Sequence, residues 1–434
     1  MLHAKEFLMT SVHRANNFHS HLHSTAFKKT TLANGIRIVS EEISSAKSVS
    51  VGVWVDSGSR NETEKNNGIS HFIEHMVFKG TDSRSIQQIA RSVESVGGYM
   101  NAFTSKEHTC FYARVLDEYA ENAIDVLSDL LQHPTFPKKE IAKEKMVVLE
   151  ELKNAEDDPD DQIHDFFEKA IFGNNALGFP VIGTAENVTN FTQENLFAYL
   201  EKYYSNGNIV VAAAGNISHD ILVALVEKYF TIKRKSKIVR NAEKIVQTTQ
   251  QRLEYKRPIQ QAHVCTGTLA FSLHSAHRYP SLVLNTLLGD GMSSRLFQNI
   301  REKHGIAYSV FSFMNLLSDT GSFGVYIGTD AKHINHSLDL VGKELRALQI
   351  KSLNKSELQR TKAQLKGNML LGLESTSNRM MRLGSSELYF GELTPIDEIV
   401  QNIDAVNADQ VTEVAKQLFN QEKFSTIIFV PEKV

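Results

Sequence analysis

The sequence predicts an α+β fold of two related domains, each built on a mainly antiparallel sheet packed with helices. Two observations support this prediction. The pattern Ser83-Arg84-x-Ile86-Gln87 recurs 211 residues later as Ser294-Arg295-x-Phe297-Gln298. Between the two copies, residues 233–251 are polar and basic and have no apolar face, as expected of a linker. We therefore predict a first domain over 27–232, a linker over 233–251 and a second domain over 252–434.

Strand signals in the first half come from turns and from alternation. Asn34-Gly35 lies between two apolar runs and predicts a β-hairpin. Residues 49–55 alternate between the two faces, which predicts a half-buried strand. Two more strands are expected between residues 99 and 116, and the apolar segment 208–215 predicts a buried strand.

Helix signals come from apolar residues spaced three and four apart. They predict helices over 71–78, 85–96, 118–133, 138–155 and 218–230. Gly97-Gly98 is expected to end the second of these helices, and Pro134 the third. The acidic run 154–161 is predicted to be a loop.

The first helix contains His71-Phe72-Ile73-Glu74-His75, which has the spacing of an inverted zinc-binding motif. His71 and His75 lie one turn apart on one face and can bind one zinc ion side by side. Glu74 can then reach water on the open side of the metal and act as general base. The alternative is an amphipathic helix with two surface histidines. Apolar neighbours argue against a solvated face, because burying three ionisable groups without a partner is costly.

A catalytic zinc site needs a third protein ligand. The helix over 138–155 offers Glu144 and Glu151, which are two turns apart and share a face, whereas Glu150 points away. The usual interpretation of such a helix is a solvated, charged surface. Spacing alone does not decide between a ligand and a solvated acid.

Three longer motifs carry a family resemblance: GISHFIEHMVFKGT at 68–81, GGYMNAFT at 97–104 and REKHGIAY at 301–308. With them the chain resembles the pitrilysin and insulinase family of zinc metallopeptidases from about residue 30 onward. Within that family it is most similar to bacterial processing peptidases and to the catalytic (beta) subunit of mitochondrial processing peptidase. The resemblance implies Glu151 as the third ligand of one zinc ion per chain, and Glu144 as an acidic residue that supports the site.

The resemblance also implies where substrate binds. The strand with Asn101, Ala102 and Phe103 resembles the edge strand on which the family binds peptides through main-chain hydrogen bonds. Arg301 and Tyr308 of the second domain would reach the zinc site and bind substrate or stabilise the tetrahedral intermediate. The two domains would then face each other as a clamshell.

The internal repeat allows a comparison within the sequence. Under its offsets, His71, Glu74 and His75 align with Leu282, Asn285 and Thr286, and Glu144 and Glu151 align with Thr361 and Asn368. None of these second-half residues is ionisable. The proposed chemistry is therefore expected in the first half alone.

These residues predict a zinc-dependent endopeptidase that acts on extended or unfolded peptides. Zinc would activate a water molecule, and Glu74 would take its proton and pass it to the leaving amine. The main alternative is a non-catalytic scaffold or partner subunit of a peptidase complex, but such subunits have degenerate ligands and here the set is complete. A weaker alternative is a metal-binding or storage protein that uses the histidines of residues 1–26.

Composition limits the partners. With a net charge of −3 over 434 residues, the sequence gives no electrostatic case for nucleic acid or an anionic membrane. No apolar run approaches the roughly 20 residues that span a bilayer. Cys110 and Cys265 are expected to be buried thiols of a reducing compartment.

The sequence also leads to predictions of compartment and assembly. We predict a cytoplasmic protein (alternative: mitochondrial matrix) with a disordered extension at 1–26. A homodimer is expected, because the second domain has only Leu288-Gly-Asp-Gly291 where the family's non-catalytic subunit has a long glycine-rich loop.

Overall fold

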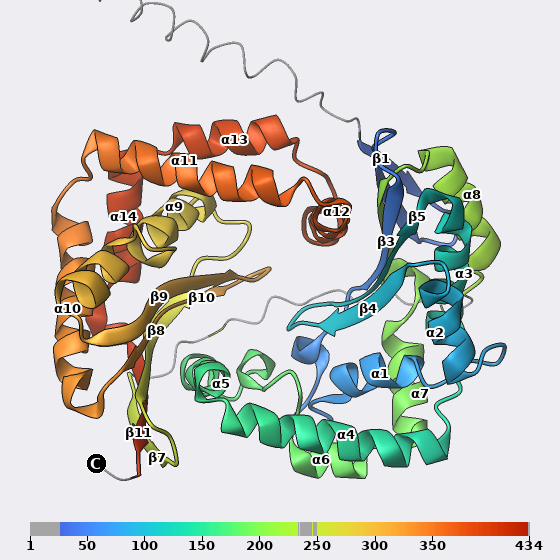
Figure 1. The fold of residues 1–434 in the computed structure, drawn as a ribbon, viewed down its shortest axis with the longest axis horizontal. Coiled ribbons are helices and arrows are strands. Elements are labelled where there is room, and N and C mark those ends of the chain that lie inside the picture. The colour runs from blue at the N-terminus through green and yellow to red at the C-terminus, as the bar shows by residue number, and fades with distance from the viewer. Residues whose placement is uncertain (1–26, 233, 235–244, 246–249, 433–434) are drawn as a thin grey trace, which may run out of the picture.

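Two sheets face each other across the molecule in the computed structural model, which describes residues 27–232, 234, 245 and 250–432 (Figure 1). The first half forms a six-stranded sheet in the order β1-β2-β6-β3-β5-β4. Its strands are β1 (Phe27–Thr31), β2 (Arg37–Glu42), β3 (Ser48–Val55), β4 (Tyr99–Thr104), β5 (Thr109–Leu116) and β6 (Ile209–Gly215). The second half forms a five-stranded sheet in the order β7-β11-β8-β10-β9. Its strands are β7 (Arg252–Arg257), β8 (Ala262–Ala270), β9 (Ala307–Leu316), β10 (Gly321–Thr329) and β11 (Ser425–Pro431).

The two sheets share one topology, which confirms the predicted α+β repeat. The series β2-β6-β3-β5-β4 corresponds strand by strand to β7-β11-β8-β10-β9. In the described chain β2–β6 and β7–β11 are the parallel pairs, and the remaining pairs are antiparallel. Strands β4 and β9 are the free edges that point into the space between the halves (Figure 1).

Helices cover the outer face of each sheet (Figure 1). The first half contributes α1 (Ile69–Val77), α2 (Ile86–Glu94), α3 (Ala120–Gln132), α4 (Lys138–Asp157), α5 (Pro159–Phe172), α6 (Ala185–Asn190), α7 (Gln193–Tyr203) and α8 (His219–Tyr229). The second half contributes α9 (Arg278–Gly289), a π-helix (Phe297–Lys303), α10 (Ile334–Ile350), α11 (Lys355–Gly372), α12 (Thr376–Phe390), α13 (Ile396–Ala405) and α14 (Ala408–Leu418). The helices predicted in the first half are confirmed, with small shifts at their ends.

Two helices are exchanged between the halves. Helix α5 packs on β8 and β11 of the second sheet, and α12 packs on β2, β3 and β6 of the first sheet (Figure 1). A shared core joins α12 to the first sheet through Met380, Leu383 and Trp54. Gly384 permits this contact, because a Cβ there would overlap the Trp54 indole. Neither sheet is therefore complete without a helix from the other half.

This exchange corrects the prediction for the strand at 49–55. We predicted a half-buried strand, but β3 is buried on both faces from Val49 to Val55. The reason is that α12 covers the face that would otherwise meet solvent. The sequence alternates because the face covered by α12 carries Ser and Gly residues, and not because that face meets solvent.

The prediction of a loop at 154–161 is wrong. Helix α4 continues to Asp157 and α5 begins at Pro159, so that only Asp158 lies between them. The Asp158 carboxylate accepts a hydrogen bond from the backbone N–H of Asp160 and caps α5. Proline at the first helical position and acidic residues in the first turn suit a helix start, because the N-terminus carries partial positive charge.

The predicted extension at 1–26 and most of the predicted linker at 233–251 lie outside the described residues. Across the part of the chain that is described, no helix has the length and apolar character needed to cross a membrane. The two cysteines, Cys110 and Cys265, are buried and free.

Candidate metal centre

Helix α1 is held rigidly at its N-terminus. Gly68 has a φ of 97°, and a Cβ there would lie 2.7 Å from Gly183 Cα, so the chain needs glycine at this close approach. The buried carboxylate of Glu62 accepts hydrogen bonds from the backbone N–H groups of Gly68 (2.7 Å) and Ser70 (2.8 Å). Burial raises the pKa of Glu62 to about 7, although these hydrogen bonds lower it. The Glu62 carboxylate thus accepts hydrogen bonds from backbone N–H groups at the start of α1 that have no acceptor within the helix.

The apolar side of α1 packs into the first core, with Ile69, Phe72, Ile73 and Met76 at most 2% exposed. The half-buried His71, Glu74 and His75 lie on the remaining side. Because the apolar residues fix the rotation of the helix, they also fix the direction of these three side chains.

His71, His75 and Glu151 meet at one point. One potential ligand atom from each lies within 4.8 Å of the others. The two imidazole ring centres are 4.6 Å apart, and His75 Nε2 lies 3.6 Å from Glu151 Oε2. Glu151 comes from α4, which packs against α1. The predicted seven-residue spacing between Glu144 and Glu151 therefore places both carboxylates on the face of α4 that meets α1.

Glu144 lies behind His75. Its Oε1 is 2.9 Å from His75 Nδ1, and its Oε2 is 2.7 Å from the Lys79 ammonium. Burial raises the pKa of Glu144, but the hydrogen bonds from His75 and Lys79 lower it by more. The net pKa is therefore below its ordinary value. Burial lowers the pKa of His75, but the Glu144 hydrogen bond and the nearby carboxylates raise it on balance. Glu144 thus fixes the orientation of the His75 ring.

Glu74 is oriented from the edge strand. The Thr104 hydroxyl, at the end of β4, donates a 2.5 Å hydrogen bond to Glu74 Oε2. Burial raises the pKa of Glu74, the Thr104 hydrogen bond and His75 lower it, and Glu151 raises it, with a net increase. A carboxylate with a raised pKa, held by one oxygen, is suited to accepting a proton at the other.

His71 is the most buried of the three ionisable residues on α1. Burial, and then the charge of His75, lower its pKa to about 4, so the ring is neutral at physiological pH. Its Nδ1 is buried and has no hydrogen-bond partner among the described groups. A neutral imidazole beside a second imidazole and a carboxylate matches the donor set that zinc prefers.

The predicted substrate residues lie on β4. Asn101, Ala102 and Phe103 belong to this strand, which pairs with β5 on one side and is a free edge on the other. Phe103 packs edge-to-face on Trp54, with ring centres 5.8 Å apart. The strand is therefore a sheet edge, and on it the Ala102 backbone N–H donates a 2.8 Å hydrogen bond to Asn101 Oδ1.

The predicted second-half residues are not in contact with the metal ligands. Arg301 lies in the π-helix and its guanidinium stacks over Phe297, 4.9 Å from the ring centre. Tyr308 is the second residue of β9 and is 58% exposed. Within the described ranges, no hydrogen bond or ion pair joins either residue to His71, His75 or Glu151.

Sequence reasoning missed three contacts around the site. Lys79 pairs with Glu144, the Thr104 hydroxyl binds Glu74, and Glu62 holds the start of α1. Lys79 and Thr104 stand within the motifs that carried the family resemblance, but their partners come from other elements. Only the packing of α4 and β4 against α1 shows these partners.

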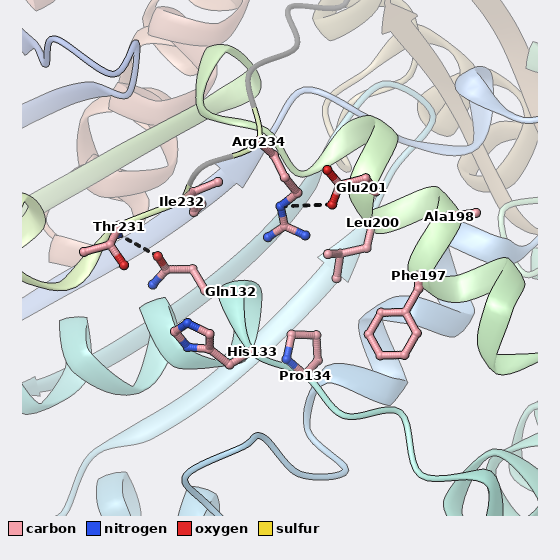
Figure 2. A pocket seen from close by; sticks show the side chains of 10 residues that line it. All are labelled: Gln132, His133, Pro134, Phe197, Ala198, Leu200, Glu201, Thr231, Ile232 and Arg234. Carbon is pink, nitrogen blue, oxygen red and sulfur yellow. Dashed lines mark hydrogen bonds and ion pairs between the residues drawn. The ribbon is translucent and has the colours of Figure 1, made fainter.

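A pocket of about 740 Å³ lies elsewhere on the first half, between α3, α7 and the segment after α8 (Figure 2). The pocket is lined by Gln132, His133, Pro134, Phe197, Ala198, Leu200, Glu201, Thr231, Ile232 and Arg234. Arg234 donates a hydrogen bond to the Leu131 carbonyl, 3.1 Å away, and faces Glu201 across the pocket. None of the predicted site residues lines this pocket.

Two family models and a set of bacterial relatives match the chain. The model of the insulinase family, peptidase family M16, matches residues 37–185, and the model of the M16 inactive domain matches residues 190–365. The chain is 43% identical over 395 residues to an uncharacterized zinc protease of Bacillus subtilis, covering 91% of this chain and 96% of the relative. It is 40% identical to one of Streptomyces coelicolor, covering 92% and 89% respectively.

Solved structures show the same fold. A protease from Helicobacter pylori superposes with a TM-score of 0.87 at 21% identity, covering 94% of this chain and 100% of that one. A peptidase M16 inactive domain from Pseudomonas fluorescens superposes with a TM-score of 0.88 at 20% identity, covering 93% and 98%. At these identities the likeness concerns the fold.

Proposed function

The chain belongs to the insulinase family of zinc proteases, peptidase family M16, and from this premise we propose that it is an endopeptidase that cuts extended or unfolded peptides. The observation that carries the proposal is the convergence of His71, His75 and Glu151 within 4.8 Å, with Glu74 beside them. Two imidazoles and a carboxylate, with one coordination position left open, are the ligand set of a catalytic zinc site.

The residues present fit a zinc ion. His71 has a buried ring nitrogen without a hydrogen-bond partner in the described structure, and Glu144 holds the His75 ring. His71, His75 and Glu151 would hold the ion, one per chain. When bound, zinc would supply Lewis-acid activation of water and of the scissile carbonyl. A carboxylate behind a ligating histidine raises the basicity of that histidine and fixes its direction, which is the role we assign to Glu144.

Glu74 would move the proton. Thr104 holds Oε2 of the Glu74 carboxylate, which leaves Oε1 to accept the proton of the attacking water. The same oxygen would then deliver that proton to the leaving amine. Because the carboxylate is held from one side, its free oxygen stays on the side of the metal ligands.

The edge strand β4 would bind the peptide. A substrate that adds a strand at Asn101–Phe103 is recognised chiefly through main-chain hydrogen bonds, which favours extended chains over folded proteins. We further propose that Arg301 and Tyr308 approach the bound peptide when the halves close. This step is supported by the exposure of Tyr308 and by the two sheet edges that point toward each other (Figure 1).

Assembly and location complete the proposal. A homodimer is supported by the short Leu288-Gly-Asp-Gly291 segment, which lacks the long glycine-rich loop of a non-catalytic partner. The cytoplasmic location, with the mitochondrial matrix as the alternative, stays a prediction.

The test is metal content and hydrolysis of an unstructured peptide by the wild type and by Glu74→Gln. We expect the variant to retain zinc and to lose cleavage by at least a thousandfold, because its side chain no longer accepts a proton. Equal cleavage by the two proteins would show that Glu74 is not the base. Loss of zinc from Glu74→Gln would show instead that this residue is a ligand.

A further inference from the structure

The turn between β4 and β5, residues 105–108, follows directly on Thr104. Within the turn, Ser105 N–H and the Ser105 hydroxyl both donate to the His108 carbonyl, at 2.8 and 2.9 Å. Thr104 pairs with Thr109 as the last pair of the two strands. The position of the Thr104 hydroxyl, and with it the carboxylate of Glu74, therefore depends on the position of this turn.

On one side, two backbone hydrogen bonds anchor the turn to the first half. The N–H groups of Ser59 and Arg60 donate to the carbonyls of Ser105 (3.1 Å) and Lys106 (2.7 Å). Gly58 is required here, because a Cβ on it would overlap the Ser105 carbonyl and lie 2.7 Å from the carbonyl of Lys106. The segment 58–60 thus lies flat against the turn and brings the Arg60 side chain beside Glu107.

The tip of the β9–β10 hairpin closes the other side of the turn. Ser318 donates to the Glu107 carboxylate from its hydroxyl (2.5 Å) and from its backbone N–H (3.1 Å). Arg60 bridges the two halves, because its guanidinium donates to Glu107 (2.7 Å) and to both oxygens of Asp319 (2.8 and 2.5 Å). The side chain of Glu107 is fully buried, and those of Arg60 and Asp319 are 12% and 18% exposed.

Both exchanged helices also meet this turn. Lys106 pairs with Glu168 of α5 at 2.8 Å, and His108 Nδ1 lies 3.1 Å from the Tyr389 hydroxyl of α12. Every residue of the turn after Ser105 therefore contacts an element that packs on, or belongs to, the other half. Ser318 and Asp319 come from the second half, so their contacts with Glu107 and Arg60 hold the turn only while the halves are docked.

We propose that the β4–β5 turn couples docking of the second half to the orientation of Glu74, with Glu107 and Asp319 acting as positioning residues through Thr104. The inference rests on the proposed role of Glu74 as general base. When the hairpin tip docks, it fixes the position of Glu107 and therefore of the turn. The turn then fixes the Thr104 hydroxyl, which orients the carboxylate of Glu74 through its hydrogen bond. Opening of the halves releases the turn, so the base is aligned only in the closed molecule.

A double-mutant cycle tests the coupling. Asp319→Asn removes the charge that holds Arg60, and Thr104→Val removes the hydroxyl on Glu74. Each is expected to lower kcat for an unstructured peptide roughly tenfold, with KM and zinc content changed less than about twofold, since small misplacement of a reacting group costs rate rather than binding. The double variant should be no slower than the slower single variant, and Thr104→Ser should restore the rate. Multiplying losses, near a hundredfold in the double variant, would overturn the proposal.

A matched control separates the turn from the interface as a whole. Arg379 of α12 pairs with Glu41 of β2, another contact between the halves that does not touch the turn. Arg379→Gln should leave kcat within about twofold of wild type, because in the described structure Arg379 and Glu41 contact neither the β4–β5 turn nor the metal ligands. An equal loss in Arg379→Gln and Asp319→Asn would mean that general loosening, not the turn, lowers the rate, and would overturn the proposal.

An activity-independent measurement completes the test. In the metal-free protein, Asp319→Asn should speed amide hydrogen exchange over residues 99–109, and Arg379→Gln should not. Unchanged exchange in Asp319→Asn would overturn the coupling. If wild type and Glu74→Gln cleave equally, the proposed function fails instead. If wild type alone cleaves but the losses multiply, only the coupling fails.

Discussion

The two halves build the same helix on the same sheet edge, yet only the first half carries ionisable residues at three aligned positions of that helix. Helix α1 holds His71, Glu74 and His75 beside β4, and α9 holds Leu282, Asn285 and Thr286 beside β9. Thr286 is 4% exposed, so the second half closes over the position that His75 occupies in the first. This helix therefore folds and packs with apolar and neutral residues at these positions. The fold does not require the ionisable residues His71, Glu74 and His75 of the first half.

One contact is present in both halves. The Ser312 hydroxyl of β9 donates to Asn285 Oδ1 at 2.8 Å, as the Thr104 hydroxyl of β4 donates to Glu74. An edge-strand hydroxyl therefore holds the same helix position in each half, and only the first half places a carboxylate there. The hydroxyl that orients this side chain is therefore present in both halves, whereas the proton acceptor is present in the first half alone.

Removal of a metal ligand should have the largest effect. We expect His71→Ala or Glu151→Ala to lose bound zinc and to reduce peptide hydrolysis by roughly four orders of magnitude or more, because two ligands do not retain a catalytic ion. Chelation of the wild type should give the same loss, reversed by added zinc. Metal analysis and steady-state rates check both expectations.

The matched change in the second half is Asn368→Ala, at the position aligned with Glu151. Asn368 is exposed on α11, and its removal should leave zinc content and rate unchanged. If Asn368→Ala abolished zinc binding, or if Glu151→Ala kept it, the assignment of the chemistry to one half would be wrong.

Much of this site could be predicted because its signals are local. The i, i+4 histidines and the two-turn spacing of Glu144 and Glu151 are helical patterns, and the structure brings His71, His75 and Glu151 together. The helix start at Asp158-Pro159 was also visible, but its acidic composition led us to predict a loop. The exchange of the two helices could not be predicted. Contacts such as Trp54 with Gly384 join residues 330 positions apart, and such contacts produce no periodic pattern in the sequence.

The exchanged helices differ in their buried charge, which makes stability depend on pH. Burial raises the pKa of Asp165 on α5 to about 6, while Lys106 lowers it and Glu168 and Asp161 raise it. The corresponding residue on α12, 217 positions later, is Arg382, whose pKa burial lowers. A half-buried acid on one helix thus corresponds to a half-buried base on the other.

Asp165→Asn should remove a pH-dependent part of the free energy of unfolding. The ordinary pKa of this carboxyl is 3.8, so its contribution is fully present below that pH and is lost as the pH rises through 6. Relative to Asp165→Asn, the wild type should lose about 2 kcal/mol between pH 4 and pH 7. Urea unfolding followed by Trp54 fluorescence measures this difference. The exposed Asp220 of α8 is the control, and a flat difference for Asp165 would contradict the prediction.

Removal of the Glu144 charge should weaken zinc binding without abolishing it. Glu144→Gln keeps the size of the side chain but removes the charged acceptor behind His75, and we expect zinc affinity to fall 10- to 100-fold. Competition with a chelator measures the affinity. The aligned change, Thr361→Val, removes a hydroxyl that bonds the Glu357 carbonyl and should leave zinc affinity unaltered. Equal affinities for wild type and Glu144→Gln would remove Glu144 from the metal centre.

The smallest effects concern the helix exchange itself. Gly384 of α12 lies against the Trp54 indole, so Gly384→Ala inserts a methyl group where no space exists. We expect the free energy of unfolding to fall by about 2 kcal/mol, as is typical of an overpacked core, and the emission of Trp54 to change. Because the chain contains one tryptophan, this signal reports directly on the contact between α12 and the first sheet.

Gly367 of α11 provides the control. A Cβ at Gly367 has no neighbour within 4 Å, so Gly367→Ala should stabilise the protein by up to about 1 kcal/mol through helix propensity, with unaltered Trp54 emission. Opposite signs for the two substitutions would show that α12, although encoded in the second half, is a structural part of the first sheet. If Gly384→Ala were as harmless as Gly367→Ala, α12 would not pack tightly on β3. The halves would then be joined by the packing of α5 on the second sheet and by polar contacts such as Arg60–Asp319, and these contacts would align the metal centre with the second half.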